Sequence, residues 1–159
     1  MKKLFAKYIS AALFLIIITS CGTTSKVAVC DQPVSKDLII RWGVVSSQSQ
    51  MDSFYELNAD RTISLGVKES RSSTPKLQEI GKIPLELYCE LLKSTRETIM
   101  KVQALNVPSD VNNYLEYKDD ANNIRFRALW NPNHDNAGNV EFKALYTRYQ
   151  EAVKAANSK

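Results

Sequence analysis

The sequence contains few of the residues from which catalytic and metal sites are most often built. Among its 159 residues there is one histidine, His134, with three cysteines and five glycines. A mononuclear zinc site needs three or four ligands, usually histidine or cysteine, and a phosphate-binding loop needs closely spaced glycines. Neither pattern is present, and there is no nucleophile elbow. We therefore expect no cofactor, no metal and no enzymatic activity.

His134 is the residue on which an enzymatic alternative depends. It lies between positions 131 and 139, in a segment rich in turn-forming residues. In that alternative His134 is a general base that Asp135 orients. The segment is more typical of a solvated loop. Asp119-Asp120 is a pair of adjacent carboxylates that could suggest acid–base catalysis, but it is more typical of a hairpin tip.

The chain also has no apolar run long enough to cross a membrane. The longest, at positions 9–18, has about ten residues. At about 1.5 Å per residue it reaches about 15 Å, against roughly 30 Å of hydrocarbon in a bilayer. Lys2, Lys3 and Lys7 precede this run, and small residues follow it. A basic start, a short apolar run and small residues before a cleavage site predict a secretory signal.

Cys21 distinguishes this leader from an ordinary secretory signal. The residues Ile-Thr-Ser-Cys at positions 18–21 resemble the bacterial lipobox, an aliphatic residue and two small ones before a cysteine. The resemblance implies that residues 1–20 are removed and that Cys21 carries acyl chains such as palmitate. Two or more chains attach a protein stably, because each buried methylene contributes about 0.8 kcal/mol. The implied location is the cell envelope, and Gly22 after the cysteine implies the outer membrane rather than the inner one.

Removal of residues 1–20 changes the charge balance of the chain. Three lysines leave with that segment, so the 21 basic side chains become 18, against 17 acidic ones. The formal charge then falls from +4 to about +1, which does not favour nucleic acid as a partner. The remaining length suits one domain. We expect a lipid-anchored tether at 21–36 and a single domain at 37–159.

Two cysteines remain once Cys21 is acylated, namely Cys30 and Cys89. Export to an oxidising compartment permits a disulfide between them. Closing a loop of about 60 residues would stabilise the domain by roughly 4 kcal/mol in the chain-entropy model. In the alternative, Cys89 is a small buried hydrophobe and Cys30 is a linker residue. The sequence leaves both interpretations open.

The hydrophobic pattern of the remaining chain predicts an α+β fold. Segments with the alternation of strands lie at 38–45, 53–57, 62–67, 76–80, 114–118 and 124–130. One amphipathic helix begins at Pro84 and is ended by Val107-Pro108. A second begins near Gly138 and has an apolar stripe at positions 142–156. This order predicts an antiparallel sheet of about five to six strands, with two long amphipathic helices packed on one face.

The same order of elements resembles that of small emfourin-like proteins, which inhibit thermolysin-type metallopeptidases. It consists of a hairpin around YELNADRTISL, a helix after IGKIP, a hairpin ending in ALWNP and a final helix. The likeness spans roughly Leu38 to Ala156. Where a glycine-rich first turn is expected, this chain has Ser-Ser-Gln-Ser-Gln. The resemblance implies a protease-inhibitor-like domain as an alternative function and identifies no inhibitory residue.

The candidate binding residues lie on the predicted strands 114–118 and 124–130. Arg125 and Arg127 point to one side of their strand, whose other side is apolar. Aromatic residues could add an exposed platform for a ligand: Trp42, Tyr55, Tyr114, Tyr117 and Trp130. The alternatives are a solvated face, with Glu116 opposite the arginines, and aromatics that belong to the core. A sheet covered on one side leaves the other accessible. We therefore expect a non-enzymatic domain that binds an envelope protein or peptide.

Overall fold

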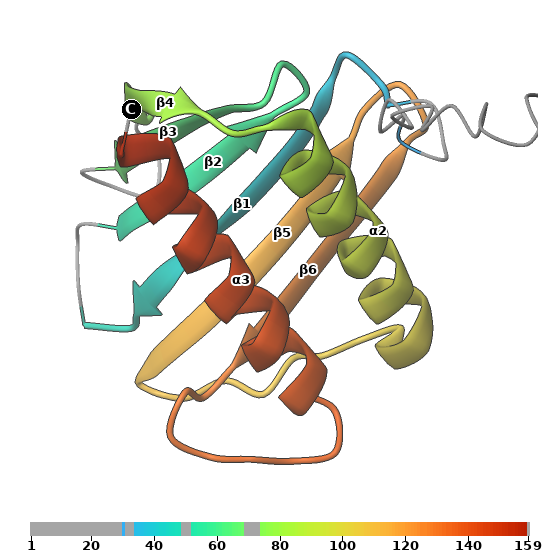
Figure 1. Cartoon of the computed structure of the whole chain (residues 1–159). Helices are drawn as coiled ribbons and strands as arrows, with labels where there is room; N and C mark the ends of the chain where they lie inside the picture. Colours follow the sequence, from blue (N-terminus) through green and yellow to red (C-terminus); the bar gives the residue numbers. More distant parts are fainter. Residues whose placement is uncertain (1–29, 31–33, 49–51, 69–73, 159) are drawn as a thin grey trace, which may run out of the picture.

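Strand β1 (Leu38–Ser46) lies inside the sheet and pairs with one strand on each side. The computed structural model describes residues 30, 34–48, 52–68 and 74–158. In these ranges the chain forms a six-stranded antiparallel sheet and two helices (Figure 1). The strand order is β4-β3-β2-β1-β5-β6. The predicted α+β class is confirmed, with the higher of the two predicted strand numbers.

The other strands match the predicted segments to within a few residues. They are β2 (Asp52–Asn58), β3 (Thr62–Lys68), β4 (Lys76–Lys82), β5 (Val111–Asp119) and β6 (Ile124–Trp130). The first four strands are neighbours in sequence order, whereas helix α2 connects edge strand β4 to β5 on the other side of β1. The pairing of β1 with β5 therefore joins the two halves of the chain into one sheet.

The core lies on the side of the sheet to which the even-numbered residues of β1 point. Leu38, Ile40 and Trp42 are buried there, as the period-two alternation of a strand requires. Trp42 stacks on Tyr55 of β2 and lies 4.6 Å, between ring centroids, from Tyr149. Buried aromatic rings bring large apolar areas together. Trp42 is therefore a central contact between the sheet and the last helix.

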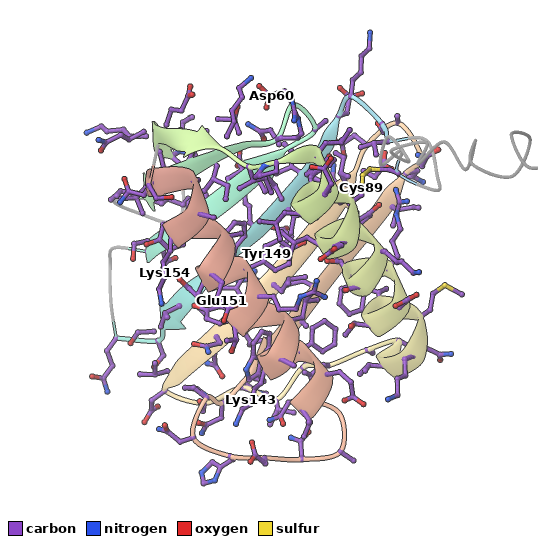
Figure 2. All side chains as sticks on the ribbon, viewed as in Figure 1. Asp60, Cys89, Lys143, Tyr149, Glu151 and Lys154 are labelled. Atoms are coloured by element: carbon purple, nitrogen blue, oxygen red, sulfur yellow. A yellow bond between two sulfur atoms is a disulfide. The ribbon has the colours of Figure 1, made fainter. Side chains whose placement is uncertain are left out.

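The two helices are α2 (Leu85–Val102) and α3 (Val140–Asn157). In the view of Figure 1 both are drawn in front of the sheet. Tyr149, which Figure 2 labels between the helices, forms a buried hydrogen bond of 2.8 Å with the hydroxyl of Thr95 on α2. Phe142 and Leu145 are buried further toward the start of α3. The apolar stripe predicted at 142–156 therefore supplies core residues.

Helix α2 ends earlier than the sequence predicts. Its last residue is Val102, and Gln103 has a φ of 61°, so the predicted end at Val107-Pro108 is wrong. The chain after it pairs with β6 instead. Val107 N–H donates to Leu129 O, and Leu129 N–H donates to Leu105 O. Leaving the helix early satisfies part of the edge of β6 and buries Leu105.

Helix α3 begins at a different residue from the predicted one. Its N-cap is Asn139 and not Gly138. The buried Asn139 side chain donates to His134 O at 2.7 Å and accepts from Asn136 N–H at 3.0 Å. An amide can donate and accept at once, so Asn139 fixes the preceding loop as the helix begins.

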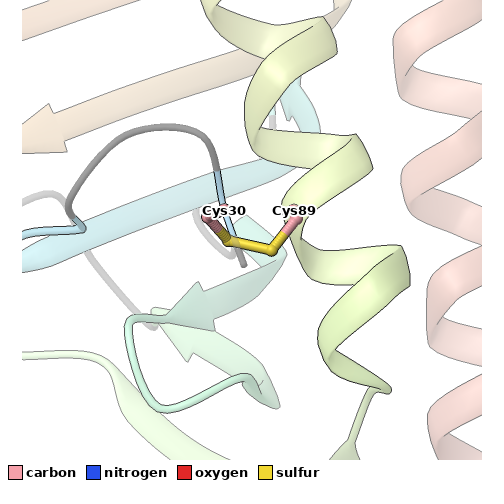
Figure 3. Close-up of a disulfide and its surroundings, with 2 residues drawn as sticks. All are labelled: Cys30 and Cys89. Carbon is pink, nitrogen blue, oxygen red and sulfur yellow. A yellow bond between two sulfur atoms is a disulfide. The ribbon is translucent and has the colours of Figure 1, made fainter. Parts of the chain in front are cut away.

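Cys30 and Cys89 form a disulfide, which is one of the two alternatives that the sequence leaves open (Figure 3). Their Cα atoms are 5.0 Å apart and 59 positions separate them in the chain. Cys30 and Val34 both pack against the core cluster. Contacts with the domain therefore begin before residue 37, inside the segment predicted as a tether.

The predicted leader at 1–20 and the predicted acylation site Cys21 lie outside the described residues. Within the ranges that the structure describes, neither helix combines the length and the apolar character needed to span a bilayer.

Candidate functional site

The candidate site is the sheet face opposite the core, which we call the arginine face. We define it by Arg41, Phe54, Glu56, Tyr114, Glu116, Arg125 and Arg127. Arg41 of β1 is paired in register with Glu56 of β2 and with Glu116 of β5. Glu116 is paired in turn with Arg127 of β6. Directly paired residues of antiparallel strands point to the same face, so a row of alternating charge crosses four strands.

A second row on this face consists of two aromatic rings beside glycines. Gly43 of β1 is paired with Phe54 on one side and Tyr114 on the other. A Cβ atom on Gly43 would lie 2.7 Å from Ser53 O, and one on Gly66 would lie 2.4 Å from Cζ of Phe54. Glycine inside a strand marks such close approaches. The Phe54 ring therefore lies over the backbone of β3 at Gly66.

The guanidinium groups of the first row cover the rings of the second. The Cζ atom of Arg41 lies 5.4 Å from the ring centroid of Phe54, and that of Arg127 lies 4.9 Å from the ring centroid of Tyr114. Both are cation–π contacts. Phe54 and Tyr114 are only 5% and 7% exposed, and burial raises the pKa of the Tyr114 phenol well above its usual range. Arginines thus shield aromatic residues on this face.

The two arginines differ in how their charge is compensated. Arg41 Nε donates to Glu56 Oε2 at 2.6 Å, and the Glu56 side chain is only 4% exposed. Arg127 is exposed, and no ion pair joins it to another residue in the described ranges. A guanidinium that stacks through its plane still has N–H donors at its edges. Arg127 can therefore bind a carboxylate or a phosphate.

Arg125 is engaged at the tip of the β5–β6 hairpin. Its Nη2 lies 3.1 Å from Asp120, and Lys118, its cross-strand partner, lies 2.6 Å from the same carboxylate. The hydrogen bond from Lys118, followed by that from Arg125, lowers the pKa of Asp120. The neighbouring Asp119 is buried and accepts a 2.8 Å bond from Asn122 Nδ2. These two carboxylates hold the hairpin tip, in agreement with the interpretation from sequence.

The structure divides the sequence-based group of Arg125, Arg127, Tyr114 and Tyr117. Residues three apart on a strand point to opposite faces, so Tyr117 lies on the core side, where Arg96 Nε donates to its hydroxyl at 3.3 Å. Tyr114 is on the arginine face, but beneath Arg127 and not exposed. Both tyrosines therefore act through packing, and the idea of an exposed tyrosine platform is wrong.

Three residues of the arginine face were not singled out from sequence: Arg41, Phe54 and Glu56. Neither were Gly43 and Gly66, which lie beside Phe54 in the paired strands. Two strand-interior glycines were the available signal, because glycine in a strand often marks the approach of another group. The two tryptophans are fully buried and belong to the core. The aromatic residue that does accompany the arginines besides Tyr114 is Phe54.

His134 is exposed in the loop before α3. Its backbone carbonyl is bonded, accepting from Asn139 Nδ2 at 2.7 Å and from Lys143 Nζ at 2.9 Å. Asp135 pairs with Lys143, so the geometry does not show the orientation of His134 by Asp135 on which the enzymatic alternative depends. No cluster of three or more potential metal ligands occurs in the part of the chain that the structure describes.

No protein-family model matches this chain, and no curated protein matches it either. The likeness to emfourin-like inhibitors stays a prediction. A proposal for the function therefore rests on the geometry of the arginine face.

Proposed function

We propose that the mature protein is a lipid-anchored, non-enzymatic domain of the bacterial cell envelope that binds an acidic segment of a partner protein or peptide. The anchor is the acylated Cys21 of the lipobox-like sequence, and the binding surface is the arginine face. The observation that carries the binding proposal is the state of the Arg127 side chain. It is exposed, it stacks on Tyr114, and it forms no ion pair with another described residue.

The proposal includes the inference that both amphipathic helices pack on one side of the sheet. Trp42 lies 4.6 Å from Tyr149 and Trp130 lies 5.8 Å from Phe142, between ring centroids, so α3 packs on the core side. The Thr95–Tyr149 hydrogen bond joins α2 to α3. Figure 1 supports this arrangement, since both helices are drawn in front of the sheet. The arginine face is then open to a partner.

The chemistry of Arg127 favours an acidic partner. The planar guanidinium matches a carboxylate through two parallel N–H donors. Stacking on Tyr114 restricts the side chain before any partner arrives, so less rotamer entropy is lost on binding. Glu116 lies beside Arg127 in the row, so a partner with separated acidic residues fits better than a densely charged polyanion.

Intact-mass measurement of protein isolated from bacterial membranes tests the anchor. We expect a chain that begins at Cys21 and carries acyl chains, and we expect Cys21→Ala to lack them. A native chain that retains residues 1–20, or that begins at Cys21 without an acyl adduct, would contradict the anchor. That result would leave the binding proposal untouched.

Titration with a short peptide in which glutamates alternate with glycines, followed by backbone amide NMR shifts, tests the binding surface. We expect the shifts to gather on β5 and β6 and to disappear in Arg127→Gln. Lys154→Gln on α3 is the matched control, because it removes one exposed positive charge from the helix side (Figure 2). Shifts that persist in Arg127→Gln, or no shifts in the native protein, would contradict an acidic partner at this face. The same peptide with glutamine in place of each glutamate controls for peptide binding without charge.

A further inference from the structure

The disulfide attaches the N-terminal segment near one end of the domain. Cys89 lies in the second turn of α2. In Figure 2 it lies near the same end as Asp60 of the β2–β3 turn, and Lys143 near the start of α3 lies at the opposite end. The strands run between these ends, and nine residues of β1 at about 3.3 Å each span about 30 Å. The segment from the lipid therefore reaches the domain at one defined end.

Chain length limits how far that end can lie from the membrane. From Cys21 to Cys30 there are about nine residue steps, and a fully extended chain covers at most about 3.5 Å per step. Cys30 therefore stays within about 30 Å of an acylated Cys21. Without the bridge, the next described residue that packs against the core is Val34. The limit then grows to about 45 Å.

We propose that the Cys30–Cys89 disulfide is a redox-sensitive spacer that sets the maximum distance between the membrane and the arginine face. The proposal rests on the lipid anchor proposed above. With the bridge intact, the tether from the lipid ends at Cys30. When the bridge is reduced, the tether can extend to Val34, and the maximum distance of the domain from the lipid grows by about half.

The step is a thiol–disulfide exchange with a dithiol reductant. One thiolate of the reductant attacks a sulfur of the bridge and forms a mixed disulfide, and the other sulfur leaves as a thiolate. The second thiol of the reductant resolves the mixed disulfide. Two electrons and two protons pass to Cys30 and Cys89, and the reductant becomes a disulfide. Both cysteines are partly exposed, so a reductant can approach them.

Energy transfer from tryptophan to vesicles with a dansyl-labelled headgroup tests the spacer in the native lipidated protein. The chain has two tryptophans, Trp42 and Trp130, and both are fixed in the core. We expect transfer in the oxidised protein and a loss of transfer after a dithiol is added. Cys30→Ser/Cys89→Ser should show the low value in both conditions. Circular dichroism checks that the reduced protein and this variant remain folded.

A second variant tests the distance limit with the bridge intact. Insertion of four Gly/Ser residues after Gly22 lengthens the tether by four residue steps, the number from Cys30 to Val34. We expect its transfer, while oxidised, to equal that of the reduced native protein. Unchanged transfer in this insertion variant would overturn the spacer, and so would unchanged transfer in the folded double-serine variant. Absence of an acyl adduct by intact mass, or failure to float with vesicles, would overturn the anchor instead.

Discussion

The guanidinium of Arg127 lies over the ring of Tyr114, with its Cζ atom 4.9 Å from the ring centroid. Tyr114 is only 7% exposed, although it lies on the sheet face opposite the core. The exposed side chain of Arg127 covers it. The contact thus has two consequences at once. It shields an aromatic residue from water, and it holds a guanidinium in place with its edge available to a partner.

Arg127→Ala should lower the free energy of unfolding by about 1 kcal/mol, because it removes a cation–π contact and exposes the Tyr114 ring. Urea unfolding, followed by circular dichroism, measures the change. Arg125→Ala is the matched control on the same strand and face. Its salt bridge is at the exposed hairpin tip, so we expect a change below about 0.5 kcal/mol. Equal effects of the two variants would contradict the shielding role of Arg127.

Gly43→Ala and Gly66→Ala should both destabilise the domain, and to different degrees. At Gly43 the new Cβ meets backbone at 2.7 Å, whereas at Gly66 it meets the ring of Phe54 at 2.4 Å. The backbone cannot yield without moving a strand, so we expect the larger loss of stability at Gly43. An added methyl group in a well-packed region costs roughly 1–3 kcal/mol, and we expect Gly43→Ala to lie near the upper end of that range.

A partial rescue separates these two glycine effects. In Gly66→Ala the obstacle is one side chain, so adding Phe54→Leu should recover part of the lost stability. The same second substitution should not rescue Gly43→Ala, because Ser53 O remains in the way. Melting temperatures of the two single variants and the two double variants measure the rescue. If Phe54→Leu rescued Gly43→Ala and not Gly66→Ala, the obstacles would have been assigned to the wrong glycines.

The faces of the strands could be predicted from sequence, because alternation in an extended chain has a fixed period of two. That period places Arg125 and Arg127 on one face of β6, and Ala128 and Trp130 on the other face, as in the structure. It also separates Tyr114 from Tyr117, which differ by an odd number of positions, although they were grouped as candidates. The partners Arg41 and Phe54 depend on the order of the strands, and the local pattern holds no information about that order.

The ends of the helices were less predictable because they depend on distant contacts. Pro108 is a strong local signal for the end of α2, yet the helix ends at Val102. The deciding interaction is the pairing of the following segment with Leu129 of β6, far along the chain. At the start of α3, a glycine pattern predicted Gly138, but the bonds of Asn139 to its own loop fix the boundary.

Removal of either partner of the buried Thr95–Tyr149 hydrogen bond should have unequal effects. The Thr95 hydroxyl has a second partner, Leu91 O, at 2.7 Å, and Tyr149 is completely buried. Tyr149→Phe leaves the Thr95 hydroxyl satisfied, so we expect a loss of about 1 kcal/mol. Thr95→Val leaves the Tyr149 hydroxyl buried without its partner and should cost about 2 kcal/mol.

Urea unfolding of both variants at neutral pH tests this asymmetry. The pKa of Tyr149 is raised by burial, so its hydroxyl is protonated under these conditions and titration does not complicate the comparison. A larger loss in Tyr149→Phe than in Thr95→Val would show that another group satisfies the tyrosine.

Asp60 should make a small contribution to stability that depends on acid pH. Hydrogen bonds from Lys82 and Thr62 lower the pKa of its carboxyl from 3.8 to about 2. The folded state therefore favours the ionised form. The stabilisation is present in full above about pH 4 and is lost as the pH falls through about 2. Because the Asp60 side chain is 58% exposed, solvent screening keeps the effect below about 1 kcal/mol.

Asp60→Asn tests this contribution by comparison with the native protein across pH. At neutral pH the variant should be the less stable of the two, since it loses the ion pair with Lys82 at 3.0 Å. Between pH 4 and pH 2 the difference should shrink as the native carboxyl is protonated. Glu151→Gln, an exposed substitution on α3 (Figure 2), controls for the loss of one negative charge. A stability difference that stays constant with pH, or an NMR titration that places the Asp60 pKa at its ordinary value, would show that the Lys82 pair does not stabilise the fold.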